Sequence, residues 1–362
     1  MSAWDDNRIL DLFGIDMPIV LAPMAGAGGA PLAIAVAQAG GLGSLPCAML
    51  SVDDAHAAVA LFRESTARPV TLNFFCHTRT IDDTRATSAW RAQLHHYFDE
   101  LGLDADNTPQ PVPPIRAFDV QYCELIEEVR PAVVSFHFGL PDASLTARVH
   151  AAGAKIIASA TTVTEARWLA ARGCDAIIAQ GAEAGGHRGS FLAPSAVAQQ
   201  VGTFALVPQI VDAVDVPVIA AGGVGDARGI AAALALGASG VQMGTAYLSC
   251  PESTLSPSYR QALKTVRDDA TALTNVLTGR PARAIVNRVV AELGAIAEHA
   301  PGFPDAAAAL AVLRSKAESL GSSDFSSFWA GQAAPLAHAL PAGEVTRRLA
   351  AEALRRIGCG AA

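Results

Sequence analysis

Short apolar runs that end in glycine, proline or a small polar residue recur along this chain, separated by alanine-rich stretches of helical period. This alternation is typical of repeated βα units, whose parallel strands are buried on both faces. Eight runs are predicted as strands: Pro18–Ala22, Gly41–Leu45, Val70–Asn73, Ala132–Phe136, Lys155–Ala158, Ala176–Ala179, Pro217–Ala220 and Gly240–Met243. Eight consecutive units predict the α/β class and a (β/α)8 (TIM) barrel.

Glycine precedes several of the predicted strands, as in HAAGAK, AARGCD and LALGAS. We expect Gly153, Gly173 and Gly237 to end helices in the left-handed conformation and to release the chain into the next strand. The boundaries from helix to strand are therefore the most sharply predicted ones.

Two stretches fall outside the βα pattern. Residues 77–128 predict the third helix and a surface loop that contains the proline-rich NTPQPVPPIR. Beyond the eighth strand, Ser253–Leu320 predicts helices with no further strand, followed by a last barrel helix near Pro341–Ile357. We therefore predict a barrel of residues 1–250 and 336–362, and an appended helical cap of residues 251–335 over the barrel mouth, where insertions are common.

The formal net charge of -8 and the absence of any basic block argue against nucleic acid or an anionic membrane as a partner. The acidic start MSAWDDNRIL does not resemble an export signal, and the apolar runs are far shorter than the ~20 residues that span a bilayer. The six cysteines are scattered without zinc-ligand spacing, which favours reduced thiols. We expect a soluble cytoplasmic protein with a small-molecule partner; the oligomeric state stays open.

Glycines follow the last two predicted strands. Gly222 and Gly223 come after the seventh strand, and Gly244 and Thr245 after the eighth. Taken singly, such glycines merely turn the chain. Together they fall where barrels usually bind phosphate, because glycine lets backbone N–H groups approach an anion. The pair predicts a phosphorylated ligand.

His187 lies in the glycine-rich loop QGAEAGGHRG, which is a poor place for a core histidine. An imidazole of ordinary pKa, ~6.5, can accept a proton from a carbon acid. The alternative interpretation is a residue that stabilises the loop through a hydrogen bond. The spacing of Glu183 and His187 would suit a metal on a helix, but the intervening Gly185 and Gly186 disfavour a helix, so we predict no metal. Arg188 is expected to contact a phosphate or solvent.

His137, between Phe136 and Phe138, directly follows the fourth predicted strand. The alternation of side chains along a strand leaves two positions open for it, the core and the mouth of the barrel.

At PIVLAPMAG, AQGAEAGGHRG, PVIAAGGV and QMGTAYL, the chain resembles the nitronate monooxygenases, formerly called 2-nitropropane dioxygenases, over about Pro18–Leu248. SFHFGLP at Ser135–Pro141 resembles the subgroup called class I, and WAGQAA at Trp329–Ala334 is also similar to the family. The resemblance implies an FMN-dependent barrel that oxidises alkyl nitronates, such as propionate 3-nitronate, with O₂ to a carbonyl compound and nitrite. The FMN contacts that it implies are Ala22, Pro23, Met24, Asn73, Gln180, Gly185, Gly222, Gly223, Gly244, Thr245 and Gln332.

In this resemblance His187 matches the histidine proposed as the base for neutral nitroalkanes, and His137 matches one expected beside the substrate. A nitronate is already deprotonated, so His187 would then serve as a positive or hydrogen-bonding partner of the nitro group. The chain has only four tyrosines, and Phe303 stands where the resemblance implies a hydroxyl, which weakens the case for a carboxylated substrate.

Two other reactions stay open. One is an FMN-dependent NAD(P)H:quinone or enoyl-thioester reductase of the same fold. The other is a non-redox barrel, such as a lyase or an isomerase, that binds a phosphorylated ligand in the same two loops.

Overall fold

The computed structural model of the chain describes residues 4–78, 84–105, 115–193 and 197–358. Its main sheet has eight strands, all paired in parallel, in the order β1-β9-β8-β6-β5-β4-β3-β2. They are β1 (Ile19–Leu21), β2 (Gly43–Pro46), β3 (Val70–Phe75), β4 (Val133–His137), β5 (Lys155–Ala160), β6 (Ala176–Gln180), β8 (Val218–Ala221) and β9 (Gly240–Met243). A bridge between Val20 and Leu42 joins the two ends of this order, so the sheet closes. The predicted barrel is confirmed.

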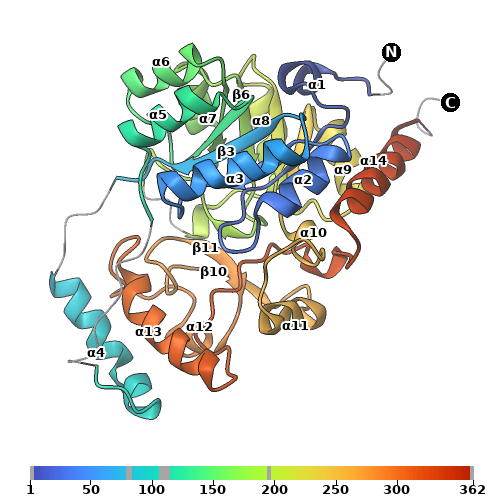
Figure 1. Cartoon of the computed structure of the whole chain (residues 1–362). Coiled ribbons are helices and arrows are strands. Elements are labelled where there is room, and N and C mark those ends of the chain that lie inside the picture. Colours follow the sequence, from blue (N-terminus) through green and yellow to red (C-terminus); the bar gives the residue numbers. More distant parts are fainter. Residues whose placement is uncertain (1–3, 79–83, 106–114, 194–196, 359–362) are drawn as a thin grey trace.

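Eight helices cover the outside of the barrel (Figure 1): α2 (Ala30–Gln38), α3 (Val52–Ser65), α5 (Val120–Val129), α6 (Ala143–Ala151), α7 (Val163–Ala170), α8 (Thr203–Val211), α9 (Ala227–Ala235) and α14 (Ala342–Gly358). Helix α14 packs against α2 and α9, so the C-terminal helix predicted from the sequence completes the ring. Short helices α1 (Arg8–Phe13) and α10 (Thr245–Leu248) precede β1 and follow β9. No described helix combines the length and apolarity needed to cross a membrane.

The predicted glycine turns are present. Gly153, Gly173 and Gly237 have φ values of 92°, 89° and 93°, which place each in the left-handed region just before a strand. These glycines end α6, α7 and α9 and start β5, β6 and β9.

The segment after the barrel strands contains strands as well as helices, so the prediction of no strand within Ser253–Leu320 is wrong. Strands β10 (Thr271–Thr274) and β11 (Ala282–Ile285) form an antiparallel hairpin, and β11 also pairs with β7 (Gly186–His187). The runs TALT and ARAI are too short and too poor in apolar alternation to signal strands by themselves. The same segment contains α11 (Pro257–Thr265), α12 (Arg288–Leu293) and α13 (Ala306–Ser319), with one-turn helices at Val197–Gln199 and Ala334–Leu336 elsewhere in the chain.

Helix α4 (Thr84–Glu100) leaves the barrel and packs against α13 (Figure 1). Its Trp90, Leu94, Tyr97 and Phe98 are buried in a second hydrophobic core that is separate from the barrel core. The helix that covers the barrel between β3 and β4 is therefore α5 and not the first helix of this stretch. Most of NTPQPVPPIR lies outside the described residues. We call α4, α11–α13 and the β10–β11 hairpin the cap.

Candidate active site

The mouth of the barrel is lined by polar side chains from five strands. Phe74 and Phe136 face outward, because each ring packs on Phe118 with centroids 5.1 Å apart. Residues one position away on each strand therefore face inward, and paired residues of neighbouring parallel strands face the same side. This register assigns the following inward side chains near the carboxyl ends of the strands: Asn73, Phe75, Ser135, His137, Ser159, Gln180 and Gln242.

Two of these inward side chains hold the loop that carries His187. The His187 carbonyl accepts a hydrogen bond from Nε2 of His137 at 3.1 Å and from the amide nitrogen of Gln180 at 2.9 Å. The Gln180 side-chain oxygen accepts from the Gly189 backbone at 2.8 Å. Since a carbonyl can only accept, His137 is protonated at Nε2, and its Nδ1 accepts from the Ser159 hydroxyl at 3.0 Å. Both ring nitrogens of His137 are thus occupied by the protein.

The His187 ring lies between the barrel and the cap. Its Nε2 is 2.9 Å from Oγ1 of Thr278, which lies in the loop between β10 and β11. The ring centroids of Phe303 and Trp329 lie 5.1 Å and 5.2 Å from that of His187. Phe303 occupies the position where the resemblance implied a hydroxyl, and it adds an apolar ring to the lining. The aromatic rings around His187 are Phe75, Phe138, Phe303 and Trp329.

Both histidines are neutral at physiological pH. Burial, together with the positive charges of Arg280 and Arg188, lowers the pKa of His137 to about 3 despite the hydrogen bond to the His187 carbonyl. Burial also lowers the pKa of His187 to about 3, and electrostatic interactions with the nearby His137, Arg280 and His77 act in the same direction. His187 is therefore a hydrogen-bonding group and a very weak base.

Arg188 does not contact solvent, so that alternative of the prediction is wrong, and its side-chain donors are used by protein groups. Its side chain is fully buried and donates to the backbone carbonyls of Gln180 and Gly181 and to the Gln200 side chain. A buried guanidinium whose donors are used in this way fixes the loop after β6. Glu183 has a similar structural task, because its carboxylate accepts from the backbone and hydroxyl of Thr203 at the start of α8. Among the described residues, no group of histidine, cysteine and carboxylate side chains could hold a metal.

The loops after β8 and β9 offer backbone donors. In the described part of the chain, the N–H groups of Gly222, Gly223, Gly244 and Thr245 donate no hydrogen bond to another protein group. The Thr245 hydroxyl accepts from the backbone of Gly331 at 2.9 Å, which leaves its own hydrogen available. Unused donors at the ends of the last two strands fit a phosphate group.

Some of these glycines also have a packing role. A Cβ on Gly222, whose φ is 100°, would lie 2.8 Å from the backbone nitrogen of Ala184, and one on Gly185 would lie 2.6 Å from that of Gly331. The backbone of the loop after β6 therefore packs directly against the backbone of residues 329–334. The Gln332 backbone donates to the Glu183 carbonyl at 3.0 Å, so the structure brings this distant motif to the barrel mouth.

The residues after β1 lie beside the end of β9. Ala22 donates from its backbone to the Met243 carbonyl at 2.9 Å, and Pro23 follows it directly. The Met24 sulfur lies 3.4 Å from where a Cβ on Gly244 would be. Asn73 is buried inside the barrel, and its amide donates to the Ser135 hydroxyl at 2.7 Å. All residues that the sequence assigned to the cofactor therefore gather at one end of the barrel, and their contact with FMN stays a prediction.

Sequence reasoning missed Gln242, Thr278 and Arg280. The half-buried Gln242 faces into the barrel one residue before the end of β9, and strict alternation along that strand could have identified it. Thr278 and Arg280 come from the cap, and no local pattern links them to a histidine about 90 residues earlier in the chain.

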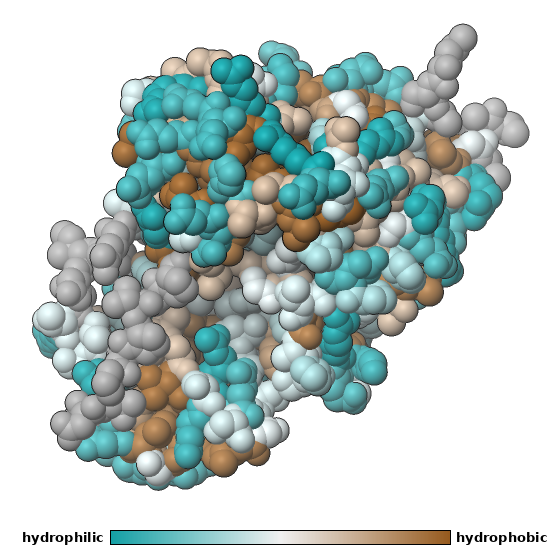
Figure 2. Space-filling view, viewed as in Figure 1, coloured by the Kyte–Doolittle hydropathy of each residue, from teal (hydrophilic) through white to brown (hydrophobic). Residues whose placement is uncertain are grey.

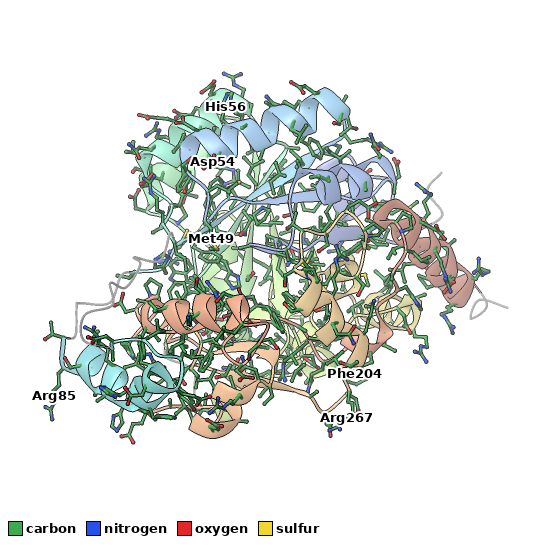
Figure 3. The ribbon with its side chains drawn as sticks, turned by 60° about the horizontal axis from the view of Figure 1, so that its bottom comes forward. Met49, Asp54, His56, Arg85, Phe204 and Arg267 are labelled. Atoms are coloured by element: carbon green, nitrogen blue, oxygen red, sulfur yellow. The ribbon has the colours of Figure 1, made fainter. Side chains whose placement is uncertain are left out.

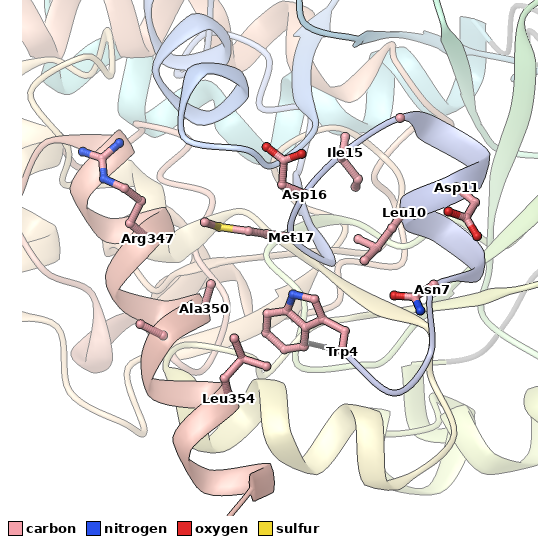
Figure 4. Close-up of a pocket in the computed structure, with 12 residues that line it drawn as sticks. Trp4, Asn7, Leu10, Asp11, Ile15, Asp16, Met17, Arg347, Ala350 and Leu354 are labelled. Atoms are coloured by element: carbon pink, nitrogen blue, oxygen red, sulfur yellow. The ribbon is translucent and has the colours of Figure 1, made fainter. Parts of the chain in front are cut away.

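Figure 2 shows a recess in the molecular surface between the barrel and the cap. A second pocket lies at the opposite end of the barrel, between α1 and α14 (Figure 4). Apolar side chains such as Trp4, Leu10 and Leu354 line much of it, and its few polar groups form no cluster suited to catalysis.

Comparison with known proteins agrees with this geometry. Residues 6–352 match the family model described as nitronate monooxygenase. A nitronate monooxygenase from Pseudomonas aeruginosa is 41% identical over 356 residues, which cover 96% of this chain and 99% of the relative. A nitroalkane oxidase structure from Streptomyces ansochromogenes superposes with a TM-score of 0.87 at 36% identity, covering 98% of this chain and 99% of that one. A structure of FabK from Thermotoga maritima reaches a TM-score of 0.75 at 29% identity, with 98% of each chain covered. The chain is an enzyme of the nitronate monooxygenase family, whose members are generally flavin-dependent.

Proposed function

We propose that this enzyme uses FMN to oxidise alkyl nitronates, propionate 3-nitronate or similar compounds, with O₂ to a carbonyl compound and nitrite. The choice of a nitronate over a neutral nitroalkane as substrate rests on His187, which is neutral and weakly basic. Free cysteines at all five described positions agree with the reducing environment of the cytoplasm, where we propose that the enzyme acts.

A neutral nitroalkane must lose a proton from carbon before it can be oxidised in this way. An efficient general base has a pKa near the working pH, and the pKa of His187, about 3, is far below it. His137 cannot replace it, because both of its ring nitrogens already have protein partners. A nitronate has already lost this proton, so the site is suited to the anion.

The mouth residues fit FMN. The unused N–H groups of the β8 and β9 loops and the Thr245 hydroxyl would hold the phosphate, and the inward-facing Asn73 and Gln242 would face the ring system. The other proposed contacts are Ala22, Pro23, Met24, Gln180, Gly185 and Gln332. When bound, the flavin supplies the redox chemistry between substrate and O₂.

The protein's own groups bind and orient the substrate. Phe75, Phe138, Phe303 and Trp329 provide apolar surface for an alkyl chain and exclude water. The ring of His187, held by Thr278, is available to hydrogen-bond the nitro oxygens. Gln180 and His137 act through the His187 backbone and are positioning residues.

Anaerobic mixing tests this proposal. The purified protein is expected to be yellow, and propionate 3-nitronate or ethylnitronate should bleach the flavin rapidly, with nitrite formed in air. Rapid bleaching by NADH or NADPH without bleaching by a nitronate would instead assign a reductase of the same fold. A colourless protein that FMN cannot reconstitute would point to a non-redox barrel that binds another phosphorylated ligand.

A further inference from the structure

Arg280 lies beside the two mouth histidines. It belongs to the loop between β10 and β11, and its guanidinium carbon is 4.0 Å from the centroid of the Phe138 ring. The Phe138 ring lies 4.5 Å from that of His137 and 6.0 Å from that of His187. A residue of the cap thus brings a positive charge to the mouth of the barrel.

The backbone around Arg280 is fixed. Gly279 has a φ of 87°, and a Cβ there would lie 2.0 Å from the Pro301 carbonyl oxygen, so only glycine fits. On one side of Arg280, Thr278 contacts His187, and on the other, Ala282 of β11 pairs with His187 of β7. The backbone of Arg280 is therefore placed by the same contacts that place His187, and the Ser190 carbonyl and the Phe138 ring hold its guanidinium group.

Arg280 has no carboxylate partner among the described residues. Its guanidinium donates to the Ser190 carbonyl and forms no ion pair there. Glu165 is the negative group that acts on it over a longer distance in this part of the chain. The Glu165 carboxylate already accepts from the backbone and hydroxyl of Thr161, both at 2.7 Å, and from the Phe191 backbone at 2.8 Å.

The interior near the mouth carries an excess of positive charge although the chain as a whole is at -8. Among the residues that the structure describes, Arg188, Arg280 and Arg283 interact there with two carboxylates, Glu165 and Glu183. Burial lowers the pKa of Arg280 to about 10, so the group remains charged at neutral pH. A half-buried cation without a carboxylate partner is costly, and an anionic ligand would offset that cost.

We propose that Arg280 binds the negatively charged oxygens of the nitronate group and so selects the anion over the neutral nitroalkane. The planar fork of a guanidinium group matches two oxygens on one planar atom, as it does in a carboxylate. This inference rests on the proposed function, because it takes a nitronate as the substrate. In this proposal a cap residue, and not a residue of the barrel loops, determines the preference of the enzyme for an anionic substrate over a neutral one.

The test compares the FMN-loaded wild type with Arg280→Gln, Arg280→Lys and the control Arg267→Gln. Arg267 is an exposed cap arginine that pairs with Asp269 (Figure 3). Nitrate, a planar inert anion, and neutral nitroethane are titrated against the flavin absorbance, and KM and kcat are measured for ethylnitronate and propionate 3-nitronate.

Arg280→Gln should raise the nitrate Kd and both KM values about 10- to 100-fold, the usual effect of losing a hydrogen bond to a charged group. The nitroethane Kd should stay within about threefold, and Arg280→Lys should recover part of the loss. Arg267→Gln should behave as wild type.

An equal loss of affinity for nitrate and nitroethane in Arg280→Gln would overturn the proposal and make Arg280 a structural support for the Ser190 loop. An unchanged nitrate Kd would overturn it as well. An effect on propionate 3-nitronate without one on ethylnitronate would assign Arg280 to the carboxylate and reject contact with the nitronate oxygens. If the wild type binds nitrate through Arg280 but oxidises no nitronate, the proposed function fails while anion binding by Arg280 stands.

Discussion

The two half-buried neutral histidines, His137 and His187, predict a loss of stability in mild acid. The pKa values of His137 and His187 are lowered from 6.5 to about 3 in the folded protein, so the unfolded chain binds protons more readily. Their contribution to stability is complete above about pH 6.5 and is lost as the pH falls towards about 3. Between these limits each histidine changes the unfolding free energy by about 1.4 kcal/mol per pH unit.

At pH 5 the loss amounts to about 2 kcal/mol for each histidine, or about 4 kcal/mol for both, relative to pH 8. Urea unfolding of the FMN-loaded protein, followed by circular dichroism at fixed FMN, gives the unfolding free energy at each pH. His137→Gln and His187→Gln should each reduce the slope of the unfolding free energy against pH, measured between pH 5 and pH 6, by about 1.4 kcal/mol per pH unit. This change corresponds to the uptake of about one proton fewer on unfolding. The slope is informative even if a variant is less stable overall.

His56 provides the matched control. It lies exposed on α3 and pairs with Glu128 (Figure 3). The same measurement on His56→Gln shows the effect of removing an exposed imidazole. If His187→Gln leaves the slope of the wild type unchanged, His187 is protonated in the folded state at these pH values, and the preference for a nitronate that we derive from its weak basicity loses its physical basis.

Three further substitutions test individual contacts. Thr278→Val removes the hydroxyl that lies 2.9 Å from Nε2 of His187. In steady-state assays it should lower kcat/KM for a nitronate about tenfold, and Thr278→Ser should restore the activity. Gly185→Ala places a Cβ 2.6 Å from the Gly331 nitrogen and should cost about 1–3 kcal/mol, and an unchanged melting temperature would contradict this close packing. Arg188→Met removes the side-chain donor of the Gln180 carbonyl and leaves the Gly181 carbonyl with the Ala184 N–H alone, so urea unfolding should show a loss of about 2 kcal/mol.

The barrel was predictable because its signals are local. Each strand is a short apolar run, and the turns at Gly153, Gly173 and Gly237 need a left-handed residue whatever the rest of the chain does. The loops proposed to bind phosphate could be located from the same pattern, since the ends of the last two strands are fixed once the strands are counted.

The cap was only partly predictable because it is held by contacts between distant segments. β11 has little strand propensity of its own and is stabilised by pairing with β10 and with Gly186–His187. Helix α4 belongs to the cap because Trp90 and Leu94 pack with residues such as Leu310 and Leu313, which come more than 200 positions later. No periodicity within α4 indicates which partner its apolar face will meet.

Site chemistry depends on hydrogen-bond partners, which residue types alone do not specify. The sequence predicts His137, Gln180 and His187 as site residues. Only the structure shows that His137 and Gln180 both donate to the backbone carbonyl of His187. Arg188 illustrates the same limit, because an arginine in a glycine-rich loop is normally exposed, whereas here the carbonyls of the loop itself bind it in the interior.

The strand pair β7–β11 connects the chemistry of the barrel to that of the cap. Through it, and through the hydrogen bond from the Arg188 backbone to the Pro281 carbonyl, the loop that contains Thr278 and Arg280 is positioned against His187 by backbone hydrogen bonds, which do not depend on the identity of the side chains. The barrel end where we propose that FMN binds can therefore stay constant, while substitutions in the loop between β10 and β11 and at Phe303 change the charge and polarity that face the proposed substrate. In this chain these positions present one cation and an apolar ring, a combination suited to an alkyl nitronate.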